Sequence, residues 1–96
     1  MLHIIAKSPV EPIMLDRIDA GDTVLFIRSA VLAVLSGNIL CERLTVMTEQ
    51  NQLYALSPDL EARGISPEEL LEGIGIIDYA DFVELTMEHL VIHSWG

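Results

Sequence analysis

The sequence predicts a three-layer α/β/α sandwich built on a mostly parallel sheet of four to five strands. Three observations lead to this fold class. Short apolar runs recur along the chain, segments with helix-capping residues separate them, and 96 residues are enough for only one core. We therefore expect residues 1–96 to form a single domain.

The predicted strands are short runs that are almost entirely apolar, which is typical of parallel strands covered on both faces. A closing run is expected to form an edge strand. Gly75 weakens one of the five because glycine has no side chain to pack. The runs are "LHIIA" (2–6), "TVLFI" (23–27), "QLYAL" (52–56), "IGII" (74–77) and, at the edge, "LVIHSW" (90–95).

Helix signals stand between these runs. Pro12 opens the first predicted helix and Gly21 follows its end, which is the usual asymmetry of helix termini. The segment "PDLEAR" at 58–63 predicts a very short helix. Ser66 and Glu69 have the spacing of a capping box, in which each side chain satisfies a main-chain N–H near the other. The chain therefore alternates strand and helix about four times before its closing strand, which favours parallel crossovers.

The last predicted helix begins after Asp78, which can cap it. Its expected sheet-facing side has the spacing i, i+3, i+4, i+7. Glu84 and Glu88 are expected on the opposite, solvated side. The four predicted sheet-facing residues are Tyr79, Phe82, Val83 and Thr86.

The segment "SAVLAVLS" at 29–36 is predicted to be a helix that is apolar on every side after Ser29. Such a helix has to be buried all round. One side belongs to the sheet, and we expect the other to meet another subunit, the alternative being that a neighbouring helix or loop of the same chain covers it. The predicted interface residues are Ser29, Ala30, Val31, Leu32, Val34 and Leu35.

Composition also indicates a partner surface. Apolar residues make up 51% of the chain, and its mean hydropathy is +0.44 despite a net charge of −10. This is more apolar surface than one small core hides. Five basic against fifteen acidic residues argue against direct binding of nucleic acid, which depends on Lys and Arg. Any role with RNA would require another chain.

Sequence features favour a cytoplasmic protein without membrane contact. The opening "MLHIIAKSP" lacks the basic start of a signal peptide. The longest apolar stretch, 23–35, contains Arg28 and is too short to span a bilayer. One cysteine excludes an intrachain disulfide and fits a reducing compartment.

The one thiol, Cys41, is a weak catalytic candidate. It stands near the start of a predicted helix that Asn38 can cap, where main-chain N–H groups favour a thiolate. Glu42 and the negative charge of the chain oppose this. We favour a packing role, and a reactive thiol remains the alternative.

No other residue pattern predicts catalysis, a metal or a cofactor. The three histidines have no ligand spacing, "GIG" at 73–75 lacks the context of a dinucleotide loop, and the acids of the last helix fit a cap and a solvated stripe. Ligands of open parallel sheets gather beyond the carboxyl ends of the strands. The residues there include no nucleophile with an adjacent base; they are Lys7, Ser8, Arg28, Ser29, Ser57 and Asp78. From the residues alone, we expect a small interaction domain that is not an enzyme by itself.

Several segments together resemble the TusB/DsrH family of sulfur-relay subunits, and the resemblance runs almost end to end. They are "MLHIIAKSP", "GDTVLFI", "YALSPDLEARGI", "IDYADFVELTMEH" and the "SW" at 94–95. The resemblance implies a DsrE/DsrF/DsrH-like fold shared with two sister subunits, called TusC and TusD or DsrF and DsrE. It also implies assembly as a dimer of heterotrimers, a heterohexamer.

In the Tus branch, the complex passes persulfide sulfur toward 2-thiolation of the wobble uridine in tRNA. In the Dsr branch, it serves dissimilatory sulfur oxidation. The resemblance places the principal sulfur-carrying cysteine on the TusD or DsrE sister and gives the B/H subunit a mainly assembly-forming role. Sulfurtransferase activity would then belong to the complex rather than to this chain alone.

This sequence departs from the family pattern in two places. "LDRIDAGD" at 15–22 lacks the first-helix cysteine frequent in the DsrH branch, which favours the Tus branch. "IRSAV" at 27–31 replaces the usual Asp-Gly pair; Ser29 can still cap a helix, but a binding role of that loop is not supported. Cys41 matches no cysteine of the family. The alternatives are a DsrH-like subunit of a DsrEFH complex, or a stand-alone homo-oligomer in which 29–36 meets its own copy.

Overall fold

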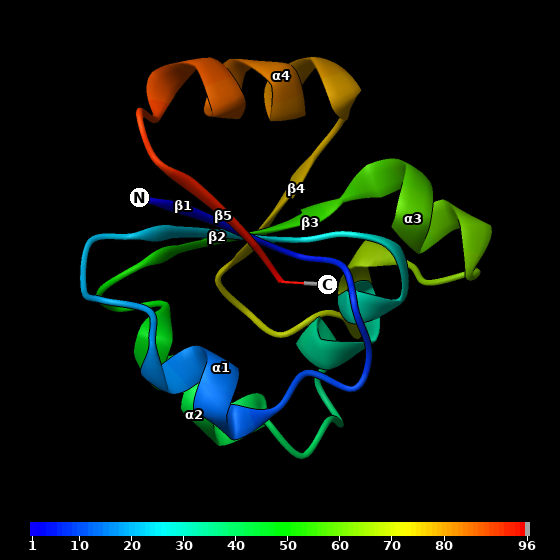
Figure 1. Ribbon diagram of the computed structural model, residues 1–96. Helices are drawn as coiled ribbons and strands as arrows, with labels where there is room; N and C mark the ends of the chain where they lie inside the picture. Colours follow the sequence, from blue (N-terminus) through cyan, green and yellow to red (C-terminus); the bar gives the residue numbers. More distant parts are fainter. Residues whose placement is uncertain (96) are drawn as a thin grey trace.

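The computed structural model describes residues 1–95 and shows five parallel strands in the order β4-β3-β2-β1-β5 (Figure 1). All five predicted strands are confirmed, and β5 lies at an edge next to β1. The register aligns Leu2 of β1 with Thr23 of β2 and with Ile92 of β5. The strands are β1 (Leu2–Ile5), β2 (Thr23–Phe26), β3 (Gln52–Leu56), β4 (Ile74–Ile77) and β5 (Ile92–Trp95).

Helices cover both faces of this sheet, which confirms the α/β/α arrangement. Figure 1 shows α4 on one side of the strands and α1 and α2 on the other. The helical segments are α1 (Pro12–Asp16), the 3-10 helix η1 (Arg28–Val34), α2 (Cys41–Met47), α3 (Ser57–Ala62), the 3-10 turn η2 (Pro67–Glu69) and α4 (Tyr79–Glu88).

Two of the predicted caps are present. Asp78 Oδ1 accepts a hydrogen bond from the main-chain N–H of Asp81 at 2.9 Å, and Asp81 Oδ2 accepts one from the main-chain N–H of Asp78 at 3.2 Å. Ser66 and Glu69 form the expected capping box at η2. Each pair satisfies main-chain groups that a helix start leaves without partners.

Helix α1 is much shorter than the predicted segment between Pro12 and Gly21. Its chain leaves the helix at Asp16 because the Asp22 carboxylate accepts the Asp19 main-chain N–H at 3.2 Å. Such local side-chain bonds compete with helix continuation. Gly21 then turns the chain toward β2 with a φ of 92°, a conformation that favours glycine.

The core has two parts because alternate strand residues point to opposite faces of the sheet. The larger part lies beneath α1, α2 and η1 and includes Ile5, Val24, Phe26 and Leu53. The smaller part lies under α4 and consists of Leu2, Leu25, Leu56, Ile77 and Leu85.

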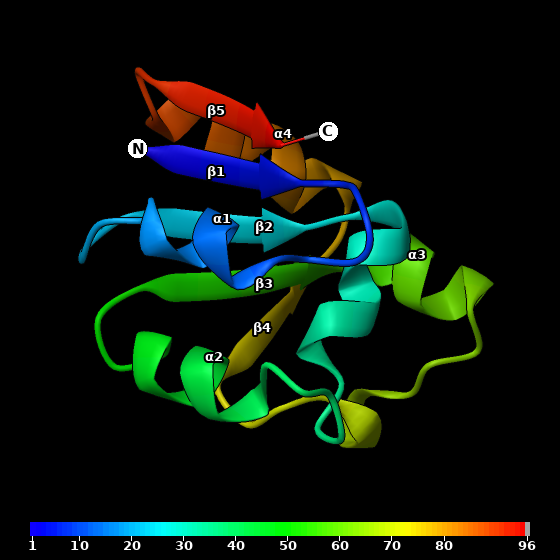
Figure 2. The ribbon, with the colours of Figure 1, turned by 60° about the horizontal axis from the view of Figure 1, so that its bottom comes forward.

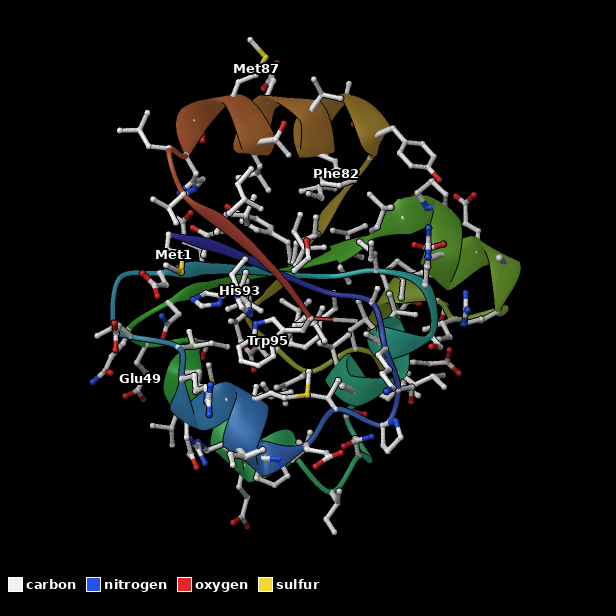
Figure 3. The ribbon with its side chains drawn as sticks, in the orientation of Figure 1. Met1, Glu49, Phe82, Met87, His93 and Trp95 are labelled. Carbon is white, nitrogen blue, oxygen red and sulfur yellow. The ribbon has the colours of Figure 1, made fainter. Side chains whose placement is uncertain are left out.

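Helix α4 is rotated relative to the prediction. Phe82 packs against the smaller core as expected, and Figure 3 shows its side chain pointing toward the sheet while Met87 points away. Tyr79 and Val83, however, are exposed. Leu85 takes the buried position instead. The helix has apolar residues on two sides, so its periodicity alone did not determine which side meets the sheet.

The segment predicted as an all-apolar helix at 29–36 is the 3-10 helix η1, and Ser29 does not cap it. With three residues per turn, side chains three apart share a row. The rows Ala30/Ala33 and Val31/Val34 are buried by this chain's own α2, α3 and sheet. The third row, Ser29, Leu32 and Leu35, is half-buried or exposed. Of the six predicted interface residues, only the three in this row are therefore accessible to a partner.

Candidate functional site

The carboxyl ends of β1, β2 and β3 meet at one edge of the sheet, where the sequence analysis looked for a ligand site. Arg28 has a left-handed backbone with a φ of 52°, which is unusual for a residue with a side chain. Its main-chain N–H donates to Asp59 Oδ2 of α3 at 2.7 Å. The Ser29 hydroxyl donates to the Ala6 carbonyl at 3.4 Å. The hydroxyl and carboxylate here hold the main chain in place and form no nucleophile–base pair.

Cys41 is the first residue of α2, so its expected place at a helix start is confirmed. Its side chain is half-buried and packs against the larger core. Among residues 1–95 its sulfur has no hydrogen-bond partner and no neighbouring cation in an ion pair. Arg43, two residues on, pairs with Asp16 of α1 instead. The packing role of this thiol remains the favoured prediction, and a reactive thiol remains the alternative to be tested.

A polar network that the sequence did not predict joins β1, β2 and β5. His3, only 2% exposed, is one of two buried polar residues within 1–95. Its Nε2 lies 2.9 Å from Asp22 Oδ2, and its Nδ1 lies 3.3 Å from the indole Nε1 of Trp95. His93 stacks edge-on against Trp95 with ring centroids 4.4 Å apart, and both side chains are labelled in Figure 3.

Asp22 is the electrostatic centre of this network. Burial raises the pKa of its carboxyl, but the hydrogen bonds from His3 and from the Asp19 main chain outweigh burial. The Met1 amine, 3.3 Å away, acts in the same direction. The net result is a pKa below the ordinary 3.8, so the carboxylate stays charged beside His3.

The three histidines, for which the sequence predicted no metal site, lie on two faces of the sheet. His3 and His93 lie close, with ring centroids 6.0 Å apart, whereas His89 ends α4 on the other face of the sheet. Within the described chain, no group of three or more His, Cys, Asp or Glu side chains is placed to hold a metal ion.

A second feature missed by the sequence analysis lies beside α4. A groove of about 270 Å³ separates this helix from β3 and β4. We call it the α4 groove; it is lined by Tyr54, Ile77, Asp81, Glu84, Leu85 and Glu88. Glu84 and Glu88 were predicted to be solvated, and they are exposed, as is Asp81. All three line this groove.

The outward side of α4, next to the acidic residues of the groove, is apolar and exposed. Tyr79, Val83 and Met87 follow one another at four-residue intervals, and Leu90 continues the row. Met87 is 79% exposed and points away from the sheet in Figure 3. We call these four residues the α4 stripe. Of these four, Tyr79 and Val83 were predicted to face the sheet, whereas Met87 and Leu90 were not assigned to either side.

No helix within residues 1–95 has the length and hydropathy needed to cross a membrane. The family described as "DsrH like protein" matches residues 7–91. The chain is 36% identical to Protein TusB of Pectobacterium parmentieri over 98 aligned positions, covering 99% of this chain and 100% of that protein. It is 39% identical to Protein TusB of Serratia proteamaculans with the same coverage.

Two solved structures share the fold. The protein of unknown function MTH1491 from Methanobacterium thermoautotrophicum has a TM-score of 0.79 at 17% identity, with 98% of this chain and 96% of that chain covered. The ychN protein from E. coli has a TM-score of 0.77, also at 17% identity, covering 98% and 97%. At such identity these two show the fold alone. The family match and the full-length similarity to TusB proteins go further: the chain belongs to the TusB/DsrH family.

Proposed function

We propose that this chain is a non-catalytic, assembly-forming subunit of a TusBCD-like sulfurtransferase complex that relays persulfide sulfur for 2-thiolation of the tRNA wobble uridine. The observation that carries the proposal is the similarity to TusB proteins, which extends over 99% of the chain. The sister subunits, TusC-like and TusD-like, would form a dimer of heterotrimers with it in the cytoplasm. The sulfur-carrying cysteine would belong to the TusD-like sister.

The side chains of this subunit fit a non-catalytic role. Its one thiol, Cys41, is half-buried and lacks an activating base. The Ser29 hydroxyl is engaged with a main-chain carbonyl. With fifteen acids against five basic residues, the surface does not suit direct contact with tRNA, so the RNA would meet another subunit.

The experiment combines deletion with complementation. Deleting the gene should abolish 2-thiouridine in the affected tRNAs, measured by mass spectrometry of digested tRNA. The unaltered gene and a Cys41→Ser variant should restore it equally. Co-expression with the two sister subunits should yield one heteromer. Unchanged 2-thiouridine after deletion, together with a chain that purifies alone, contradicts the proposal.

Three alternative hypotheses predict different outcomes. A DsrH-like role is favoured by the description of the matched family, and it would make deletion impair sulfur oxidation while tRNA thiolation persists. A reactive Cys41 would make the Cys41→Ser variant fail to complement. A self-associating domain acting alone would show a defined oligomer of the isolated chain by light scattering.

A further inference from the structure

The face of the sheet beneath α4 is incompletely covered. An α-helix is about 10 Å wide, whereas five strands spaced about 4.8 Å apart form a much wider surface. Figure 2 shows α4 behind β1 and β5, with no helix behind β3 and β4. The α4 groove lies at this boundary, between the helix and the β3 and β4 residues Tyr54 and Ile77.

The floor of the α4 groove is apolar and one wall is acidic. Tyr54, Ile77 and Leu85 supply apolar surface at its base. Asp81, Glu84 and Glu88 are spaced i, i+3 and i+7 along α4, so their carboxylates follow one edge of the hollow. None of the three takes part in an ion pair within the part of the chain that the structure describes.

The charge around the groove has a single sign. All five Lys and Arg residues lie at or before Arg63, whereas seven of the fifteen acids follow it. The segment that supplies β4, α4 and β5 therefore contains no Lys or Arg. In a two-fold contact, a second copy of this chain would bring the same acids against these, at separations where screening over about 8 Å is incomplete. Like charges placed face to face oppose association.

We infer that the α4 groove, with the adjoining α4 stripe, docks a different protein chain through a segment in which Lys or Arg residues flank a large apolar side chain. The apolar side chain fills the groove, its cations pair with Glu84 and Glu88, and the α4 stripe extends the contact. This inference rests on the proposed function, because it names the surface by which the subunit meets a sister subunit of its assembly.

Charge reversal on the groove wall tests the inference. The chain and its two sister subunits are purified separately, and the affinity of the chain for the sister subunits is measured by calorimetry at several salt concentrations. The double variant Glu84→Lys/Glu88→Lys should weaken binding by about tenfold or more. It should also remove most of the salt dependence. Because cations in the last turn of a helix interact favourably with the helix dipole, the variant should be at least as stable as the unaltered chain. Circular dichroism measures this.

A matched control separates the groove from overall charge. Glu42→Lys/Glu49→Lys changes the net charge equally at exposed positions on and just after α2, on the other face of the sheet. It should bind like the unaltered chain. If both double variants weaken binding equally, or if neither weakens it, the inference is wrong. The proposed function, which requires only that the chain joins the assembly, would still stand.

Two further outcomes would contradict the inference for different reasons. If the isolated chain self-associates and Glu84→Lys/Glu88→Lys alters that oligomer, the groove meets a second copy and the inference is wrong. If the unaltered chain binds neither sister subunit, the proposed function fails and the inference fails with it. Met87→Glu, which changes the α4 stripe and spares the groove, should weaken the same heteromer.

Discussion

The indole N–H of Trp95 donates a hydrogen bond to Nδ1 of His3 over 3.3 Å, so the fifth strand is joined to the first by side chains as well as by its main-chain ladder. An indole nitrogen can only donate, and Nδ1 therefore has to accept. The imidazole proton then lies on Nε2, facing the Asp22 carboxylate at 2.9 Å. Trp95 thus sets the tautomer of His3, and His3 in turn satisfies Asp22.

Removing the indole donor should loosen β5. We expect Trp95→Phe to reduce the free energy of unfolding by about 1 kcal/mol, because the stack is kept while one buried hydrogen bond is lost. The measurement is urea unfolding followed by far-UV circular dichroism, since Trp95 is the sole tryptophan. Tyr79→Phe, at an exposed aromatic side chain, is the control and should change nothing. Equal stability of both variants would show that the indole bond contributes little.

Asp22 should make stability depend on pH in acid. Its pKa is lower in the folded protein than the ordinary 3.8, so the folded state favours the charged carboxylate. The stabilisation is fully present above that ordinary value and is lost as the pH falls through the lower folded pKa.

The measurement is the free energy of unfolding across the acid range for the unaltered chain and for Asp22→Asn. The variant should be less stable near neutrality, and the difference should vanish in strong acid. Glu49→Gln, at an exposed position, should follow the unaltered chain throughout. A constant difference at every pH would assign the effect of Asp22 to something other than its charge.

Gly75 should not tolerate a side chain. A Cβ at this position would lie 2.6 Å from Cδ1 of Tyr54, whose ring lies against the glycine on the neighbouring strand. Gly75→Ala should lower stability by about 1–3 kcal/mol, the usual range for overpacking. Gly37→Ala is the matched control because nothing lies within 4 Å of its added Cβ. Combining Gly75→Ala with Tyr54→Leu should recover part of the loss in thermal unfolding.

The row arrangement of η1 predicts different costs for two neighbouring apolar residues. Val31 is fully buried, so Val31→Ala should cost about 2 kcal/mol in the isolated chain. Leu32 is 38% exposed, and Leu32→Ala should cost much less. Thermal unfolding of the isolated chain measures both. Similar losses would mean that the two residues are buried to the same degree in solution.

The strands were predictable because a buried parallel strand is apolar along nearly its whole length, a pattern that "TVLFI" and "QLYAL" show after their polar first residues. Caps such as Asp78 were predictable for a similar reason, since both partners lie within four residues of each other. Cys41 does begin α2 as predicted, but Leu40 rather than Asn38 takes the cap position, and no side chain caps this helix.

Features that depend on distant contacts were not predictable. The partners His3 and Trp95 are 92 residues apart, and neither has a local pattern that announces the other. The rotation of α4 and the 3-10 geometry of η1 have a related cause. Both segments are apolar on more than one side, so the tertiary neighbours decide which row is buried.

The strand order has a consequence for synthesis of the chain. β1 emerges first from the ribosome, yet its outer neighbour β5 is the last of the five strands to be made. Until then β1 presents an unpaired main-chain edge that other nascent chains can join. The contact between the two ends of the sequence also raises the mean separation of contacting residues, which slows folding. The vulnerable interval of this small protein is therefore the time between the first strand and the last.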